Sequence, residues 1–419
     1  MSKLRYNVLM HNRALATLFF TIFLDMVGVG ILIPVMPAIF ADPASPHYLL
    51  PAGVSPRVGY MLLGLTFALY SFGQFVGSPI IGQLSDKFGR KKLLIFSVLG
   101  TVLGHSLFAL AVTWKSIPLL LLTRLFTGMT TGNIIVAQAS IADITTPERR
   151  AANFGLLSAA FGLGFVVGPF IGGRLADTGF VSWFTAATPF WFAALLSAVN
   201  FFFIVGMLKE THTALRREQG INWGKPLANI MHALHLKALR PLFLTGFLYN
   251  MGFTFYMTFM SVFLFFRFGW NEASLGNYFA YIGLWIIFTQ GVVTRYMNKR
   301  WSEHQILQQT IIIAGLCILA FLLAQKASWL YMIVPFFSMA LGLTGANLTA
   351  LISRSALPSV QGEVLGINGS VNALAMALPP FLAGTIAAKF DPQAPLIVAS
   401  ALIILSGVYF IGHMRRSRG

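Results

Sequence analysis

The sequence predicts an all-α integral membrane protein with twelve transmembrane helices, arranged as two six-helix bundles related by pseudo-two-fold symmetry. Three observations support this prediction: an apolar composition, a regular series of long apolar runs, and an internal repeat. Of the 419 residues, 57% are hydrophobic and only 10% are charged, and the mean hydropathy is +0.75. Soluble domains carry about 25% charged residues, so we expect most of this surface to contact lipid.

Each predicted helix corresponds to one apolar run that is long enough to cross a membrane. A bilayer core is about 30 Å thick and requires about 20 helical residues. A segment in lipid must satisfy its own backbone hydrogen bonds, which favours helices. The runs cover residues 14–40, 58–81, 93–113, 117–142, 152–176, 184–208, 241–266, 274–296, 305–325, 328–353, 363–388 and 393–413.

The first run follows a basic stretch, as the apolar part of a secretory signal peptide would. It continues to about Phe40, whereas the apolar part of a signal peptide has only about 7–15 residues. We therefore predict that this run is retained as the first transmembrane helix.

The distribution of Lys and Arg predicts which side of the membrane each connection faces. The net charge is +17, and most of the 29 basic residues lie near the termini or in every second connection. Positively charged connections remain in the cytoplasm, so we expect both termini to be cytoplasmic. Arg124 lies inside a run, and the opposite side holds only Arg57, Lys115, Arg174, Arg267, Lys326 and Lys389. Basic residues dispersed in this way do not predict a nucleic-acid-binding surface.

The longest polar connection divides the chain into two related halves. We predict an N-terminal bundle over residues 1–208, a cytoplasmic central loop over 209–240 and a C-terminal bundle over 241–419. Four pairs of residues recur 211 positions apart: Pro147 and Pro358, Gly155 and Gly366, Pro169 and Pro380, and Gly173 and Gly384. Such repeats are typical of transporters in which a path between the halves opens alternately to each side.

The connection after the second run reads GQLSDKFGRKK, from Gly82 to Lys92. Gly89 allows a tight reversal of the chain, and Asp86 and Arg90 can pair with charges on neighbouring helix ends. A basic loop that only fixes the topology is the alternative. The ordered pattern resembles the loop signature of the major facilitator superfamily.

The fifth run contains GLGFVVGPFIGG, which ends at Gly173. Gly164, Gly168 and Gly172 recur every four residues, so they share a helix face and allow another backbone to approach closely. Pro169 is expected to bend this helix. The pattern also resembles the antiporter signature of the drug-exporting branch of the superfamily, although tight helix packing alone would favour the same residues.

The resemblance extends to RLFTG and SIADITTPERR in the fourth run and to FLDMVGVGILIPVMPAIF in the first. Together these segments are most similar to tetracycline/proton antiporters and related multidrug exporters. The resemblance implies the major facilitator fold and proton-coupled export of small amphipathic compounds by alternating access. It also implies a location in the bacterial inner membrane, with small molecules, protons and the lipid bilayer as partners.

Two positions depart from the tetracycline exporters that the chain resembles. Those proteins usually carry an acidic residue in the third helix, where this sequence has Gly104 and His105. They commonly carry a histidine one turn before a glutamine in the eighth helix, where this sequence has Ile286 before Gln290. The resemblance therefore does not predict tetracycline itself as the substrate.

Asp25 is the only acidic residue well inside a predicted helix. A carboxylate in hydrocarbon costs about 2.5–3.5 kcal/mol even on insertion scales, so we expect it to have a function. Arg124 lies within about 4 Å of the same membrane depth, judged from helical rise, and is its expected partner. His105 is a second candidate, although an interhelical hydrogen bond would also explain a buried histidine.

The predicted role of this group is proton coupling, with a purely structural ion pair as the alternative. Ionised Asp25 would pair with Arg124 or attract a cationic substrate. Protonation would neutralise the carboxylate and shift the equilibrium between the two orientations of the transporter.

Two further groups are predicted from the resemblance and from polarity. The resemblance implies that Asp86, Gly89, Arg90 and Asp143 form a cytoplasmic gating cluster. Glu363 lies at the start of the eleventh run, and we expect it to cap that helix or to join the cluster. Among the polar residues in the runs, the predicted substrate-binding residues are Gln74, Asn250, Gln290 and Asn372.

The sequence contains no Walker A motif and no Cys/His metal-binding pattern, so we predict no cofactor, no metal and no enzymatic activity. The one cysteine excludes an intrachain disulfide. A dedicated metabolite or siderophore carrier, or a uniporter of the same fold, remains an alternative. An integral-membrane enzyme is a remote one, and we expect the protein to act as a monomer.

Overall fold

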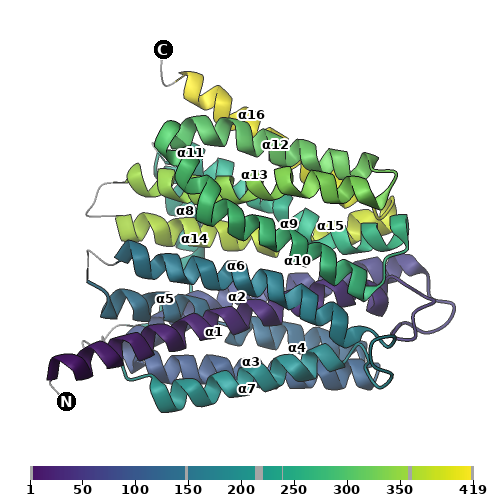
Figure 1. Ribbon diagram of the computed structural model, residues 1–419, viewed down its shortest axis with the longest axis horizontal. Helices are drawn as coiled ribbons and strands as arrows, with labels where there is room; N and C mark the ends of the chain where they lie inside the picture. The colour runs from purple at the N-terminus through teal and green to yellow at the C-terminus, as the bar shows by residue number, and fades with distance from the viewer. Residues whose placement is uncertain (1–2, 147–149, 213–219, 238, 357–360, 417–419) are drawn as a thin grey trace. The chain divides into compact units, whose positions relative to one another are not determined.

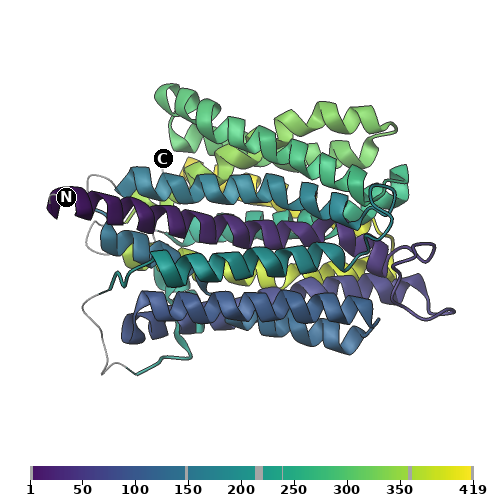
Figure 2. The same ribbon diagram turned by 60° about the horizontal axis from the view of Figure 1, so that its bottom comes forward.

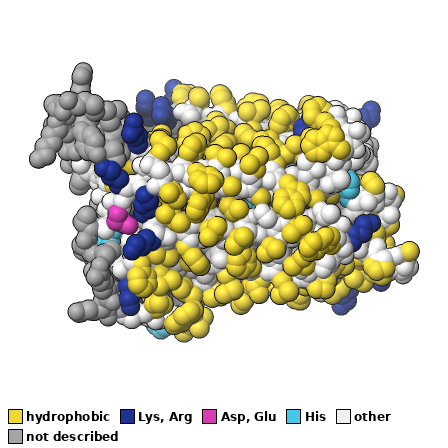
Figure 3. Space-filling model, turned by 90° about the horizontal axis from the view of Figure 1, so that it is seen from below, with side chains coloured by type: hydrophobic (Ala, Val, Ile, Leu, Met, Phe, Trp, Pro, Cys, Tyr) yellow, Lys and Arg dark blue, Asp and Glu magenta, His cyan; other side chains and the backbone are white. Residues whose placement is uncertain are grey.

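The computed structural model describes residues 3–146, 150–212, 220–237, 239–356 and 361–416, and within these ranges every regular element is helical. Long helices run side by side within each compact unit, and their connections gather at the helix ends (Figures 1 and 2). On the face shown in Figure 3, hydrophobic side chains cover the middle, whereas Lys and Arg side chains lie toward the ends. This distribution suits helices that cross a membrane.

Each predicted run corresponds to one long helix or to consecutive helical pieces. In chain order these are α1 (Lys3–Phe40), α2 (Pro56–Phe88), α3 (Arg90–Thr113), α4 (Ile117–Thr130) with α5 (Asn133–Ile144), α6 (Arg150–Ala176), α7 (Thr188–Met207), α9 (Arg240–Phe268), α10 (Glu272–Phe288) with the π-helical turn η2 (Thr289–Val293) and α11 (Thr294–Arg300), α12 (Glu303–Leu323), α13 (Ala327–Arg354), α14 (Gln361–Ala377) with α15 (Pro379–Lys389), and α16 (Ala394–Arg416). Judged by length and composition, 11 of the described segments can cross a membrane. The stretch from α10 to α11, which is the eighth span in chain order, brings the number of spans to twelve. The predicted all-α fold and the predicted helix count are therefore confirmed.

Three spans contain a break that the apolar runs do not predict. The fourth span is interrupted at Thr131 and Gly132, between α4 and α5. There the Ser78 hydroxyl donates to the Thr131 carbonyl at 2.9 Å and satisfies a backbone acceptor that has left the helix. The eleventh span is interrupted before Pro379, and the eighth contains η2. A π-helical turn often marks a functional position, and this one includes Gln290.

The chain forms two compact units. One comprises Met1–Val35 and Leu69–Trp223, and the other comprises Met36–Ala68 and Gly224–Gly419. Residues 36–68 belong to the second unit because the beginning of α2 packs on its helices. The rings of Tyr60 and Phe266 meet edge to face at 6.0 Å, and a Cβ on Gly64 would lie 2.8 Å from the Gly384 Cα. The predicted division into residues 1–208, 209–240 and 241–419 stays a prediction.

The repeated positions differ in local structure. Pro169 lies within the continuous helix α6, whereas Pro380 lies in the first turn of α15, directly after a break. Pro147 and Pro358 lie outside the described residues. In the predicted central loop, the short helix α8 (Lys225–His235) lies against α14, where Asn229 donates to the Ser370 hydroxyl at 3.0 Å.

Helix α1 is held in the first unit by close backbone contact with α6. A Cβ added to Gly164 would lie 2.8 Å from the Phe23 carbonyl oxygen, and one added to Gly168 would lie 2.7 Å from that of Val27. Gly172 faces Ile31 in the same way, while Gly173 is also buried. Real Cβ atoms do not come so close to backbone atoms, so the glycine face sets the separation of these two helices.

Apolar packing supports α1 on the N-terminal side of Asp25. Leu18 and Ile22 of α1 lie in one buried cluster with Val98 of α3 and Val136 of α5. Helix α3 also packs against α4 and α7. These contacts fix the level along the helix axes at which Asp25 of α1, His105 of α3 and Arg124 of α4 lie.

We predict that Gly168→Ala destabilises the protein by about 1–3 kcal/mol, because the methyl group forces α1 and α6 apart. Gly206→Ala in α7 is the matched control, since nothing lies within 4 Å of a Cβ at that position. Thermal unfolding of the two purified variants in detergent measures the difference. Equal melting temperatures would contradict the proposed role of this contact.

Candidate functional site

Asp25 lies in the middle of α1 and is nearly buried, with 9% of its surface exposed. Its Oδ1 accepts a hydrogen bond from the Asn133 side-chain amide at 2.8 Å, whereas its Oδ2 has no partner among the described residues. Among the described acidic residues, it alone lies far from a helix end. A carboxyl group is thus held deep in the protein by one neutral donor.

Arg124 of α4 is also buried, with 4% of its surface exposed. Its guanidinium lies over the Tyr70 ring at 4.5 Å and near the Phe108 ring at 5.5 Å, and Nε has no hydrogen-bond partner in the described part of the chain. Aromatic faces attract a desolvated cation.

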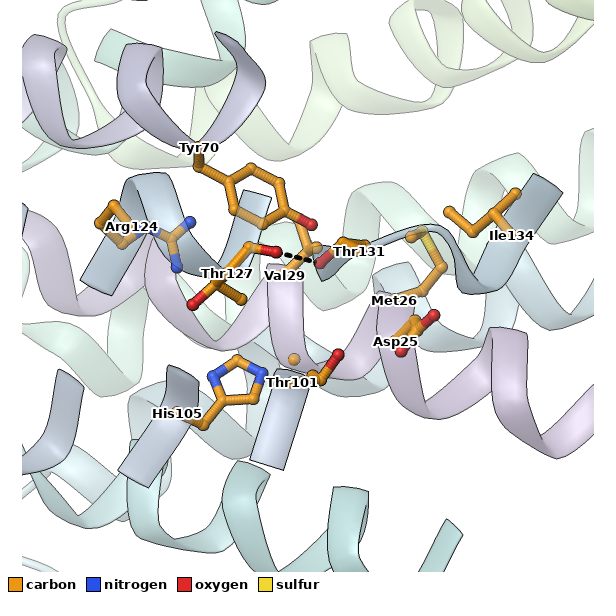
Figure 4. A pocket seen from close by; sticks show the side chains of 11 residues that line it. Asp25, Met26, Val29, Tyr70, Thr101, His105, Arg124, Thr127, Thr131 and Ile134 are labelled. Atoms are coloured by element: carbon orange, nitrogen blue, oxygen red, sulfur yellow. Dashed lines mark hydrogen bonds between the residues drawn. The ribbon is translucent and has the colours of Figure 1, made fainter. Parts of the chain in front are cut away.

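The predicted pairing of Asp25 with Arg124 is not formed in this conformation. Both residues border the same cavity, which is described below. However, the Arg124 guanidinium stacks on the Tyr70 ring, and the Asp25 carboxyl group accepts its hydrogen bond from Asn133. The side chains lie on opposite sides of the space between them in Figure 4.

His105 of α3 closes the third side of this region. Helix α1 passes so near that a Cβ on Gly28 would lie 2.9 Å from His105 Nε2. Glycine at this position therefore leaves room for the imidazole between α1 and α3. The three residues predicted to couple proton movement lie around one space.

That space is a cavity with about 20 Å³ of room for the centres of water-sized molecules. A cavity needs roughly 10–15 Å³ by this measure to hold one water. It lies among α1, α2, α3 and the junction of α4 with α5 (Figure 4), and Thr101, Thr127 and Thr131 add polar groups to its wall. The site therefore suits a proton or a water molecule, whereas drug-sized ligands need about 300–1,000 Å³.

A second group lies at the helix ends that the topology predicts to be cytoplasmic. Arg90 Nη1 lies 2.6 Å from Asp86 Oδ1, and Arg90 Nε donates to Asp143 Oδ2 at 3.0 Å. Gly89 precedes α3 with a φ of 101°, which favours glycine. The structure therefore brings Asp86, Gly89, Arg90 and Asp143 together.

Glu210 belongs to this group, although the sequence pattern does not identify it. Its carboxylate accepts hydrogen bonds from the backbone N–H groups of Arg90 at 2.8 Å and Lys91 at 3.2 Å. An anion here satisfies free donors at the start of α3 and interacts favourably with the helix dipole. His212 follows, with Nδ1 3.7 Å from Asp143 Oδ2. The available signal was an acidic residue directly after the sixth run.

The remaining predicted residues do not line the cavity. Gln74 lies half-buried in α2, and Gln290 is exposed in η2. Asn250 of α9 donates to the Asn372 side-chain oxygen of α14 at 3.1 Å, so these two predicted residues are in contact. Glu363 is in α14, and its side chain lies outside the described residues.

The sequence profile of the Major Facilitator Superfamily matches residues 18–380. The chain belongs to this superfamily. The predicted resemblance is therefore confirmed over most of the sequence, and with it the assignment of the helices to a membrane-transport fold.

Similar proteins within the superfamily include drug-resistance proteins. The chain is 30% identical to the class C tetracycline resistance protein of Escherichia coli over 409 residues, covering 96% of this chain and 95% of that protein. It is 27% identical to multidrug resistance protein 2 of Bacillus subtilis (strain 168), covering 92% and 91% of the two chains.

Solved structures show the same fold. The crystal structure of the human organic anion transporter MFSD10 (TETRAN) matches with a TM-score of 0.72 at 24% sequence identity. The match covers 96% of this chain and 99% of that one. It confirms the fold of this chain.

We predict that Tyr70→Leu destabilises the protein by about 2 kcal/mol more than Tyr70→Phe, because only phenylalanine keeps an aromatic face beneath the buried Arg124 guanidinium. The measurement is thermal unfolding of both purified variants in the same detergent. If the two variants unfold at the same temperature, the ring does not stabilise the cation.

Proposed function

We propose that this protein is a proton-coupled antiporter that exports small amphipathic compounds by alternating access. The observation that supports this proposal most strongly is the buried Asp25 carboxyl group, which borders a water-sized cavity and whose Oδ2 atom has no hydrogen-bond partner among the residues that the structure describes. An acid kept at this depth at such a cost is expected to take part in ion movement.

In the proposed cycle, Asp25 alternates between a protonated and an ionised state. The ionised state attracts the Arg124 guanidinium or a cationic group of the substrate, and protonation removes that attraction. A ligand can shift the equilibrium between two conformations only if it binds them with different affinities. The proton must therefore favour one conformation of the transporter and the substrate the other. An inward proton gradient then drives export.

The cavity is too small for the substrate, so the substrate path is proposed to lie elsewhere, between the two halves of the fold. Gln74, Asn250, Gln290 and Asn372 are proposed to line that path in some part of the cycle. Asp86, Arg90, Asp143 and Glu363 are proposed to act in gating, and Glu210 is added to them because its carboxylate binds the start of α3.

Drug export is favoured over a dedicated carrier by similarity to a tetracycline resistance protein and a multidrug resistance protein. We place the protein in the inner membrane of a bacterium, with both termini in the cytoplasm, as a monomer. The N-terminal bundle is proposed to comprise residues 1–208 and the C-terminal bundle residues 241–419, with a cytoplasmic central loop over 209–240 connecting them.

The test uses liposomes that contain the purified protein and have an acidic lumen, with ethidium and tetracycline as separate probes. We expect the wild type to accumulate at least one probe, and Asp25→Asn to fall to the level of empty liposomes because it lacks the proton-binding group. Asp25→Asn should still exchange the probe down its own gradient.

Asp177→Asn is the control, since Asp177 lies in a loop and accepts a hydrogen bond from the Gly179 backbone. It should transport like the wild type. Full gradient-driven accumulation by Asp25→Asn would refute the proposal. Transport that is indifferent to the pH gradient in the wild type would favour a uniporter.

A further inference from the structure

Asn133 is the first residue of α5 and is completely buried, at 0% exposure. Its side-chain nitrogen donates to Asp25 Oδ1 at 2.8 Å and, more weakly, to the Thr101 hydroxyl at 3.4 Å. Its side-chain oxygen has no hydrogen-bond partner among the described residues, and the same is true of Asp25 Oδ2. The side chains of Asp25 and Asn133 are thus hydrogen-bonded to each other, yet each has one buried oxygen that lacks a donor among the described residues.

A single proton satisfies both atoms. A protonated Asp25 carries an O–H on Oδ2, and the nearest amide in contact with that carboxyl group offers an unused oxygen. A carboxylic acid and a primary amide form a closed pair with two hydrogen bonds, in which each group donates once and accepts once. Buried polar atoms without a hydrogen-bond partner are costly. A hydrogen bond from the protonated Asp25 Oδ2 to the Asn133 side-chain oxygen satisfies both atoms at once, which favours this pair.

We propose that Asn133 is the second half of the proton site, so that the transported proton is bound between Asp25 Oδ2 and the Asn133 side-chain oxygen. This inference rests on the proposed function of Asp25 and identifies a positioning residue for it. The proton reaches Oδ2 from the cavity that Asp25 lines. After the change of conformation it leaves Oδ2 toward the other side of the membrane. No bond other than O–H forms or breaks.

Other titratable groups face the carboxyl group but do not replace this partner. Tyr70 of α2, His105 of α3 and Arg124 of α4 line the same cavity. The stretches of α6 and α7 that pack in this unit carry no titratable side chain between Arg150 and Arg174 or from Thr188 to Met207. Among the described residues, Asn133 is the side chain that binds Asp25 directly through a hydrogen bond.

The pair also connects proton binding to the backbone. Asn133 follows the break at Thr131 and Gly132, where the fourth span leaves helical geometry. Protonation adds a second hydrogen bond between α1 and α5 on one side of this break. The bound proton thereby favours a conformation in which α1 and α5 are close, as a coupled transporter requires.

The test is infrared titration of the purified wild-type protein and its variants in detergent. The carbonyl stretch of protonated Asp25 is identified as the band that is lost in Asp25→Asn. We expect this band to shift to higher frequency in Asn133→Leu, because the carbonyl oxygen of the acid loses the hydrogen bond from the amide. Asn133→Thr keeps a smaller group that can donate and accept, and should give a smaller shift.

Asn200→Leu is the matched control. Asn200 is an asparagine with 1% exposure in α7, and its side-chain oxygen accepts a hydrogen bond from the Thr21 hydroxyl of α1 at 3.0 Å. Within the described residues, Asp25 is hydrogen-bonded to Asn133 and not to Asn200. In Asn200→Leu, the carbonyl band of protonated Asp25 should lie at the same frequency as in the wild type. A wild-type band position in both Asn133→Leu and Asn133→Thr would overturn the proposed pair.

The same samples, returned to liposomes, separate failure of this inference from failure of the proposed function. If Asp25→Asn abolishes gradient-driven transport but the Asn133 variants leave the band in place, only the acid–amide pair is wrong. If no carbonyl band disappears in Asp25→Asn at any accessible pH, Asp25 does not bind a proton and both proposals fail.

Discussion

The structure depends on the burial of one carboxyl group. Asp25 lies in an apolar helix, with one oxygen hydrogen-bonded to Asn133 and the other without a partner in the described part of the chain. Removing a carboxylate from water without full compensation is costly, and the Arg124 guanidinium, whose Nε lacks a hydrogen-bond partner among the described residues, carries a similar cost. An acidic and a basic side chain thus border one small cavity without forming an ion pair in the described structure. A stable fold that only needed to fill this space would use apolar side chains.

Close backbone packing makes this arrangement possible. The glycine face of α6 fixes the position of α1, and Gly28 leaves room for the His105 imidazole on the other side. The interrupted backbone between α4 and α5 brings the Asn133 side chain to Asp25, and Ser78 satisfies the Thr131 carbonyl that the break exposes. The energetic cost of the polar site is thus offset by many apolar and backbone contacts around it.

The apolar runs predicted the spans closely because membrane burial constrains composition over about 20 residues at a time. They did not predict the break at Thr131 and Gly132, because no proline marks it and the apolar run continues on both sides. Three of the residues that border the cavity, Asp25, Arg124 and His105, were singled out from the sequence because acids, arginines and histidines are each rare in hydrocarbon.

The partners within that group were not predictable from depth alone. Helical rise placed Asp25 and Arg124 at one level, but the choice between an ion pair and stacking on Tyr70 depends on side-chain directions around the cavity. Asn133 appears in the sequence only as one of several polar residues in apolar runs. Its importance follows from the break that turns it toward α1.

The most direct test of the central claim is to count the protons released when substrate binds. Purified protein in weakly buffered detergent solution is mixed with ethidium or tetracycline, and the change in bulk pH is recorded. If Asp25 carries the transported proton, the wild type releases protons on binding and Asp25→Asn binds the same compound without release. Equal release from both proteins would contradict the account.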